Sequence, residues 1–179
     1  MSKIIKNAQE DFIKDEAWIL SWNASVQRAH LYNTEYKSDT KIFNKNIKKE
    51  INDLINSSYI NEECSEENHY TNIDHLVKFG SSIGVKILKD SYRYGVAQKL
   101  LNLYLKYLWC FDLIKTPPHC PIDRIILNKI KIECNWTQID KESTYRNIIE
   151  KIKGIIDQNK DVLGSPSIAE WELKMYSRR

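Results

Sequence analysis

The feature that most constrains this fold is an apolar stretch over residues 94–111 (YGVAQKLLNLYLKYLWCF) that three prolines soon follow. Leucines and aromatic residues cover most of a helical wheel here, while Lys99, Asn102 and Lys106 share one narrow stripe through three- and four-residue spacings. The prolines at 117, 118 and 121 cannot continue a helix. We therefore predict a central helix over 94–111, buried except along that stripe, and then a connector.

Helical spacing of apolar residues predicts further helices on both sides of the central one. Their ranges are 8–32, 38–55, 73–83, 121–132, 140–156 and 165–176. The polar, locally acidic stretch 56–72 is the expected longest loop. Isoleucines in 122–134 also suit a strand, but no sustained alternation demands a sheet. The predicted fold class is mainly α, with about six to eight helices in a compact domain.

Composition agrees with a globular chain that folds by itself. The 179 residues are 42% hydrophobic and 11% aromatic, which argues against disorder and allows one domain over 1–179 with a real core. The same helical periodicity predicts which side chains fill that core. They are Leu100, Leu103, Tyr107, Ile125, Ile126, Ile148, Ile149 and Ile152.

The cysteines and the apolar windows indicate a cytoplasmic protein. The four cysteines show no CxxC spacing, so reduced thiols are the simple interpretation. The opening residues lack the apolar core of a secretory signal, and no window of about 18 apolar residues predicts a membrane span. The neighbouring His119 and Cys120 fit no zinc pattern, so we expect no metal and no cofactor.

Two charges stand at the edges of the apolar region. Lys99 lies in the first turns of the central helix, where partial desolvation would lower its pKa and make it a nucleophile. The alternative is that its stem merely extends to water. Asp123 falls in the predicted first turn of the next helix, where the helix dipole favours a carboxylate. That position would explain Asp123 without any catalytic role.

The segments 94–102 (YGVAQKLLN) and 121–123 (PID) resemble the helix-hairpin-helix DNA glycosylases over about 30 residues. In that family a hairpin reading roughly Leu-Pro-Gly-Val-Gly-x-Lys precedes a helix, and a Pro-Val-Asp step begins a later one. Gly95, Val96 and Lys99 match the first motif, and 121–123 match the second. No Leu-Pro precedes Gly95, Ala97 replaces the second hairpin glycine, and 24 residues separate Lys99 from Asp123.

The resemblance implies a base-excision repair enzyme, a DNA glycosylase and lyase that acts on a flipped-out base. Lys99 would attack the sugar and form a Schiff base, Asp123 would assist, and the Gly95 and Val96 amides would hold a phosphate. His119 is a further candidate beside Asp123, although a turn residue would look the same.

Basic and aromatic residues just before the central helix suit contact with nucleic acid. They mix positive charge with stacking surface, as a solvated helix end also would. The predicted contacts are Lys86, Lys89, Arg93 and Tyr94, together with Gly95 and Val96.

A different function class stays open on the sequence alone. A non-enzymatic helical binding or accessory protein, for instance in a bacterial or phage defence or regulatory system, would also use an aromatic-rich surface. The formal net charge of +3 suits either class, because polyanion binding depends on how the basic residues cluster. For the enzyme, the predicted partner is nucleic acid, and we expect DNA. For the non-enzymatic protein, the predicted partner is a protein chain. We expect no membrane partner in either case.

Overall fold

A computed structural model describes residues 3–33, 39–163 and 166–176 of the chain. Eight α-helices and two 3-10 helices form within these ranges, and the described residues include no strand beyond a single bridge between Tyr32 and Leu88. The prediction of a mainly α fold is therefore confirmed. Among the described helices none is long and apolar enough to cross a bilayer.

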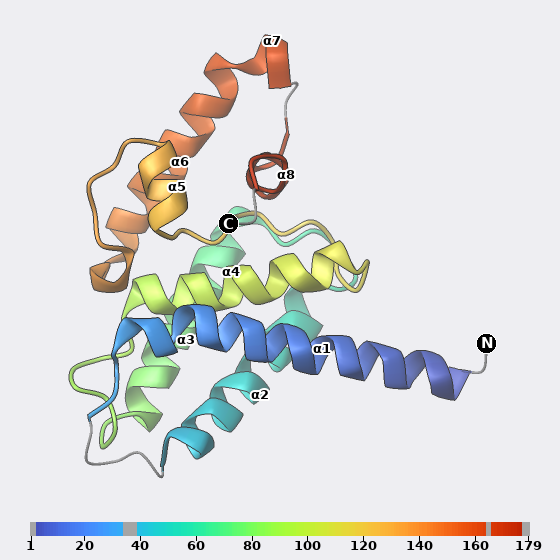
Figure 1. The fold of residues 1–179 in the computed structure, drawn as a ribbon, viewed down its shortest axis with the longest axis vertical. Coiled ribbons are helices and arrows are strands. Elements are labelled where there is room, and N and C mark those ends of the chain that lie inside the picture. Colours follow the sequence, from blue (N-terminus) through green and yellow to red (C-terminus); the bar gives the residue numbers. More distant parts are fainter. Residues whose placement is uncertain (1–2, 34–38, 164–165, 177–179) are drawn as a thin grey trace.

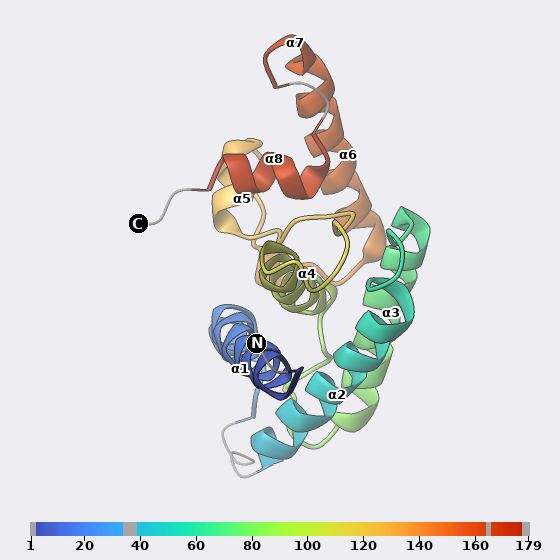
Figure 2. The same cartoon turned by 90° about the vertical axis from the view of Figure 1, so that its right-hand side faces the viewer.

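The helices group around α4 (Figures 1 and 2). Helices α1 to α3 lie on one side of α4, and α5, α6 and α8 lie on the other. The elements are α1 (Lys3–Ser25), η1 (Gln27–Ala29), α2 (Thr40–Ser58), α3 (Glu66–Ile83), α4 (Tyr94–Cys110), α5 (Arg124–Lys129), η3 (Trp136–Gln138), α6 (Glu142–Gln158), α7 (Lys160–Leu163) and α8 (Ile168–Lys174).

Helix α4 is buried on nearly all sides, more completely than the sequence indicates. Leu100, Leu101 and Leu105 have no exposed surface, as the apolar wheel predicts. The polar stripe does not face water as predicted, because Lys99 is only 4% exposed and Asn102 is fully buried. Asn102 instead donates from its Nδ2 to the hydroxyl of Tyr145 on α6, at 3.0 Å. The Nδ2 group of this buried residue therefore finds its partner within the protein, while its Oδ1 atom has no hydrogen-bond partner among the described residues.

A glycine lets η3 pack directly on the first turn of α4. A Cβ atom built on Gly95 would lie 1.9 Å from the carbonyl oxygen of Trp136. The amide of Gly95 donates to the carbonyl of Ile139 at 2.8 Å. Since only glycine fits this approach, Gly95 fixes the position of Trp136 beside α4.

The predicted long loop over 56–72 is wrong in extent. Helix α2 continues to Ser58 and α3 begins at Glu66, so only residues 59–65 connect the two helices. The hydroxyl of Ser65 accepts from the amide of Asn68, and Glu66 and Glu67 stand in the first turn, where the dipole favours carboxylates. His69 in this polar-looking stretch is fully buried, because its face of α3 packs inward.

The predicted core is correct for five residues and wrong for Ile125. Helix α5 has six residues and turns Ile126 and Leu127 inward, which leaves Ile125 40% exposed. Leu103 and Tyr107 on α4 are only half-buried. The predicted core residues that are buried are Leu100, Ile126, Ile148, Ile149 and Ile152.

Other predicted helix bounds also differ from the structure. Helix α1 begins at Lys3 rather than at residue 8 and ends at Ser25. Asp123 precedes α5 as its N-cap rather than standing inside its first turn, and Lys141 rather than Asp140 precedes α6. Ser167 begins α8 with a reciprocal capping box to Glu170. Asp39 is the N-cap residue of α2, while Ser38 and Ser165, the other residues that the sequence offers for the starts of α2 and α8, lie outside the described residues.

We expect Leu100→Ala to lower the free energy of unfolding by about 2–5 kcal/mol, because it leaves a cavity in the closed core. Leu103→Ala removes the same atoms from the same helix at a half-buried position and should cost clearly less. Urea denaturation of both variants measures the difference. An equal or larger loss at Leu103 would show that its side chain lies in the core.

Candidate active site

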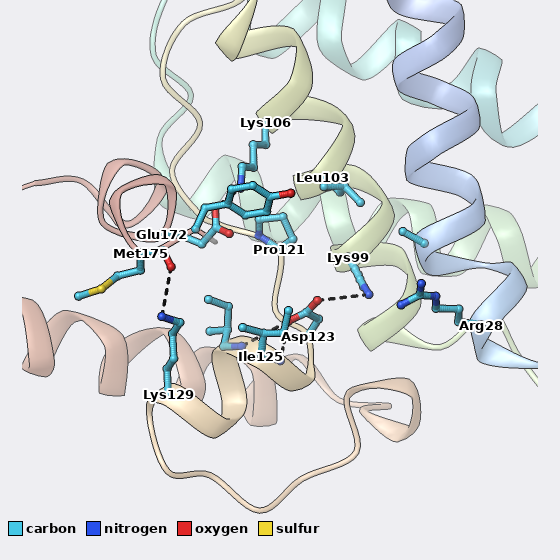
Figure 3. Close-up of a pocket in the computed structure, with 13 residues that line it drawn as sticks. Arg28, Lys99, Leu103, Lys106, Pro121, Asp123, Ile125, Lys129, Glu172 and Met175 are labelled. Carbon is cyan, nitrogen blue, oxygen red and sulfur yellow. Dashed lines mark hydrogen bonds and ion pairs between the residues drawn. The ribbon is translucent and has the colours of Figure 1, made fainter. Parts of the chain in front are cut away.

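Lys99 on α4 and Asp123 at the start of α5 lie together (Figure 3). The Lys99 Nζ atom is 3.6 Å from the Asp123 Oδ2 atom, and their side chains are 5% and 27% exposed. Both side chains line the same two hollows in the surface. The amine and the carboxylate that the sequence singled out are therefore neighbours at an opening.

The two carboxylate oxygens of Asp123 have separate contacts. Oδ1 accepts from the amides of Ile125 and Ile126, at 2.8 and 3.3 Å, and so caps α5. Oδ2 faces the Lys99 amine. The cap orients the carboxylate and leaves one oxygen to the lysine.

Gln98, which the sequence analysis missed, holds the segment before Asp123 against α4. Its Nε2 donates to the carbonyl of Ile122 at 2.8 Å, and the amide of Ile122 donates to its Oε1 at 3.1 Å. The side chain has no exposed surface. Because Gln98 precedes Lys99 and Ile122 precedes Asp123, this pair of bonds places the two charged residues next to each other. The one sequence signal for this role was the polar side chain of Gln98 within an otherwise apolar helix.

The buried position of Lys99 makes its amine easier to deprotonate than the amine of an exposed lysine. Burial lowers the pKa of the amine below its ordinary value; the charge of Asp123 opposes this shift, and the charge of Arg28 adds to it. The ring of Trp136 lies 4.0 Å from Nζ and stabilises the cation in part. Because burial outweighs these attractions, more of the amine is unprotonated near neutral pH than in an exposed lysine.

A small pocket opens on one side of the pair (Figure 3). It encloses about 130 Å³, and α8 supplies one of its walls. Lys106 and Glu172, 2.6 Å apart, bring the polar groups of an ion pair to it. The side chains that make it largely apolar are Leu103, Pro121, Ile125, Ile126, Met175 and Tyr176.

A wider cleft of about 660 Å³ opens on the other side of the pair. Four cations line it, Arg28, Lys89, Arg93 and Arg124. Residues 135–138, which include η3, complete the wall. Lys89 and Arg93, two of the contacts predicted from sequence, therefore face this cleft.

The remaining predicted contacts do not reach either hollow. Gly95 and Val96 are buried, and their amides donate to the carbonyls of Ile139 and Arg93. The prediction that these amides hold a phosphate is therefore wrong. Tyr94 is 2% exposed and presents no stacking surface, and Lys86 is exposed but lines neither hollow.

Residues 84–93 join α3 to α4, in place of the tight hairpin that the family motif would predict. In this connection, the amide of Lys89 donates to the carbonyl of Leu31, which follows η1, at 2.9 Å. The connection therefore packs beside the segment that follows η1, and Lys89 enters the cleft from there.

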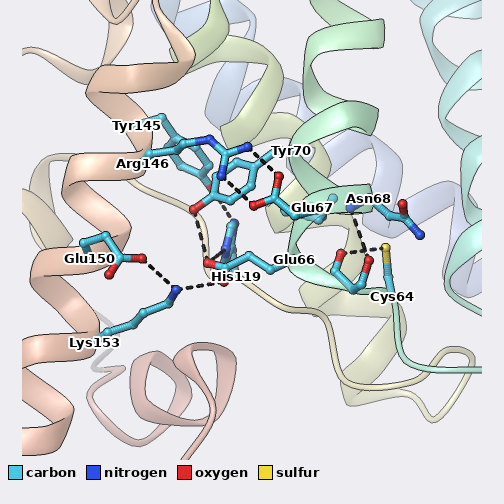
Figure 4. Close-up of polar contacts among 12 residues, drawn as sticks. Cys64, Glu66, Glu67, Asn68, Tyr70, His119, Tyr145, Arg146, Glu150 and Lys153 are labelled. Atoms are coloured by element: carbon cyan, nitrogen blue, oxygen red, sulfur yellow. Dashed lines mark hydrogen bonds and ion pairs between the residues drawn. The ribbon is translucent and has the colours of Figure 1, made fainter.

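His119 does not line the cleft as predicted; it lies in a buried polar network (Figure 4). Its Nδ1 is 3.0 Å from the Tyr145 hydroxyl, and its Nε2 is 3.0 Å from Glu66. Burial lowers the pKa of His119, and the hydrogen bond from His119 is the main cause that lowers the pKa of Glu66 to about 2. His119 therefore joins the connector to α3 and α6.

The part of the chain that the structure describes contains no group of three or more metal-ligating side chains that could hold an ion. All four cysteines are free thiols, and Cys64 and Cys120 are buried. Burial raises the pKa of the Cys120 thiol well above its ordinary value, so this thiol is a packing residue.

No protein-family model matches the chain, and neither does any curated protein or any solved structure. The candidate site is thus defined by its own residues.

We expect Asp123→Asn to lower the pKa of the Lys99 amine further, because the neighbouring negative charge raises it. Asparagine caps helices about as well as aspartate, so α5 should keep its start. NMR titration of methyl-labelled lysines measures this shift. Glu172→Gln, which changes the other carboxylate of the pocket, is the control and should leave Lys99 unchanged. A Lys99 pKa that stays constant or rises in Asp123→Asn would contradict the pairing.

Acid should destabilise the protein through its buried histidines. Burial holds the pKa of His69 well below 6.5, so below about pH 6.5 the unfolded chain binds a proton that the folded chain does not. The free energy of unfolding therefore decreases as the pH is lowered, by at most about 1.4 kcal/mol per pH unit for this residue.

His69→Asn should make this pH dependence shallower between about pH 6.5 and 5, as followed by urea denaturation. His30→Asn is the control, because His30 is exposed and asparagine tolerates its positive φ of 49°. An unchanged slope in His69→Asn would show that His69 titrates alike in both states.

Proposed function

We propose that the protein is a nucleic-acid glycosylase with lyase activity, acting on a base that has been turned out of a DNA strand. The observation that carries this proposal is the buried Lys99 amine, 3.6 Å from the Asp123 carboxylate, at the mouth of a small pocket. A desolvated amine beside a carboxylate is the arrangement that nucleophilic attack by lysine requires.

The chemistry assigns a separate task to each residue. The neutral Lys99 amine attacks C1′ of the sugar, and the electron pair of the glycosidic bond leaves with the base, which takes up a proton. Asp123 stabilises the positive charge that develops on the sugar and accepts a proton from the attacking amine.

Opening of the sugar ring then gives a Schiff base between Nζ and C1′. Loss of a proton from C2′ expels the 3′ phosphate, and water finally hydrolyses the Schiff base and frees the amine.

The small pocket suits the leaving base. It encloses about 130 Å³, and its apolar side chains match the faces of a flat ring system. The Lys106–Glu172 pair offers a donor and an acceptor to polar atoms on the edge of the base. A base seated here would bring its sugar next to Lys99, which lines the same pocket.

The resemblance to helix-hairpin-helix glycosylases supports the same roles. Lys99 matches the family's attacking lysine, and Asp123 matches the assisting aspartate. Their positions on successive helices, held together by Gln98, follow that order of motifs.

We expect wild-type protein to form a borohydride-stable adduct with DNA that contains oxidised, deaminated or alkylated bases or abasic sites. Lys99→Gln should fold and bind the same DNA but form no adduct, because the amide is no nucleophile. Lys86→Gln, an exposed lysine outside both hollows, should form the adduct at the wild-type rate. Absence of base release and of adduct with wild-type protein on every substrate would reject the proposal.

A non-enzymatic binding or accessory role is the second candidate. Exposed apolar side chains on α1 favour it, since Phe12 is 66% exposed and Ile19 and Leu20 are each 49% exposed. Such side chains on one helix suit contact with a partner chain. Binding of DNA with no adduct or base release would support this candidate instead.

A further inference from the structure

The cleft beside the Lys99–Asp123 pair holds more positive charge than the protein neutralises. Arg28, Lys89, Arg93 and Arg124 line it, and Asp123 is the one carboxylate among the residues that form its wall. Among the described residues none of these four cations takes part in an ion pair. Like charges that converge on one cleft attract an anion.

The four cations come from separate parts of the fold. Arg28 belongs to η1, Lys89 and Arg93 belong to the connection between α3 and α4, and Arg124 is the first residue of α5. A single small anion would contact only some of them. Cations spread over three segments of one cleft suit a chain of negative charges.

Arg93 and Arg28 have contacts that fix their place in this wall. The Arg93 Nη2 atom donates to the carbonyl of Ala29 at 2.7 Å and ties η1 to the start of α4, while its Nε is buried without a partner in the protein. Arg28 points toward the Lys99 amine from the opposite side to Asp123 (Figure 3). Arg28 also lines both the cleft and the small pocket.

We propose that this cleft binds the phosphodiester backbone of a nucleic-acid strand through these four side chains. Arg28 contacts the phosphate next to the sugar that Lys99 attacks, and Lys89, Arg93 and Arg124 contact neighbouring phosphates. The placement of Arg28 relative to the sugar rests on the proposed function; the backbone site itself does not.

Side chains here take the place of the backbone amides that the family motif would predict. The amides of Gly95 and Val96 already donate within the protein. The side-chain amides of Asn135 and Gln138 add neutral donors to the same wall. The chain thus has a phosphate site of its own beside the reactive pair.

Fluorescence anisotropy with a labelled single strand that carries a non-cleavable abasic analogue tests this site. Four phosphate contacts should weaken binding about 50-fold between about 50 and 200 mM salt. Arg28→Gln, Lys89→Gln and Arg124→Gln should each reduce that loss to about 20-fold, because one contact disappears. Duplex DNA and RNA strands of the same length show which backbone the cleft prefers.

Lys86→Gln is the control. It also removes one positive charge, from a lysine that is close to Lys89 in sequence but lies outside the cleft, and it should keep the wild-type salt dependence. Thermal melting monitors folding of every variant. Cleft variants with the wild-type affinity and salt dependence, or an equal effect of Lys86→Gln, would overturn the site.

The two proposals fail separately. Cleft-dependent binding without base release would leave the backbone site standing and reject the glycosylase. Base release by wild-type protein with unaltered binding in the cleft variants would keep the enzyme and reject this site.

Discussion

Burial of α4 on nearly all sides is the constraint on which the rest of the structure depends. A helix that is closed off from water must satisfy its polar side chains within the protein, since an unpaired buried group costs about 1–3 kcal/mol. Gln98 meets this demand by bonding to both backbone groups of Ile122, and the Nδ2 group of Asn102 does so through Tyr145, although the Oδ1 atom of Asn102 has no hydrogen-bond partner among the described residues. These bonds fix the connector and α6 against α4, and with them the start of α5.

The same burial gives Lys99 its chemical character. The amine lies where α4 meets the surface, between Asp123, Trp136 and Arg28. Desolvation favours the neutral amine, and the carboxylate keeps a proton acceptor at hand. Gly95 packs against the backbone carbonyl of Trp136, and the indole ring of this tryptophan contacts the Lys99 amine. The first turn of α4 is thereby linked to the site. One set of contacts thus packs α4 and lowers the pKa of the Lys99 amine.

The sequence predicts the parts of this protein that depend on local pattern. Apolar periodicity and the prolines after it predict the bounds of α4 and the connector. The resemblance to two family motifs led to the candidates Lys99 and Asp123. The start of α3 was also within reach, because Ser65 followed by two glutamates is a capping signal. The buried face of this helix carries His69 and Tyr70 in place of aliphatic residues, so the sequence showed no apolar helical pattern there.

Other parts of the site could not be predicted, because they come from segments far apart in the chain. Arg28, Arg124 and Glu172 belong to three elements, and no local pattern indicates that they share the hollows around Lys99. The Gly95 and Val96 amides were expected at a phosphate on the basis of the motif alone. The unforeseen packing of residues 136–139 on α4 occupies the Gly95 amide instead, and the Val96 amide donates to the Arg93 carbonyl.

The central claim is that the Lys99 amine is the group that reacts. Peptide mapping by mass spectrometry, after borohydride reduction of the protein on abasic DNA and nuclease digestion, tests it most directly. The account predicts a sugar-derived mass on the peptide that contains Lys99. The same mass on a different lysine, such as the neighbouring Lys106, or no modified peptide at all, would contradict it.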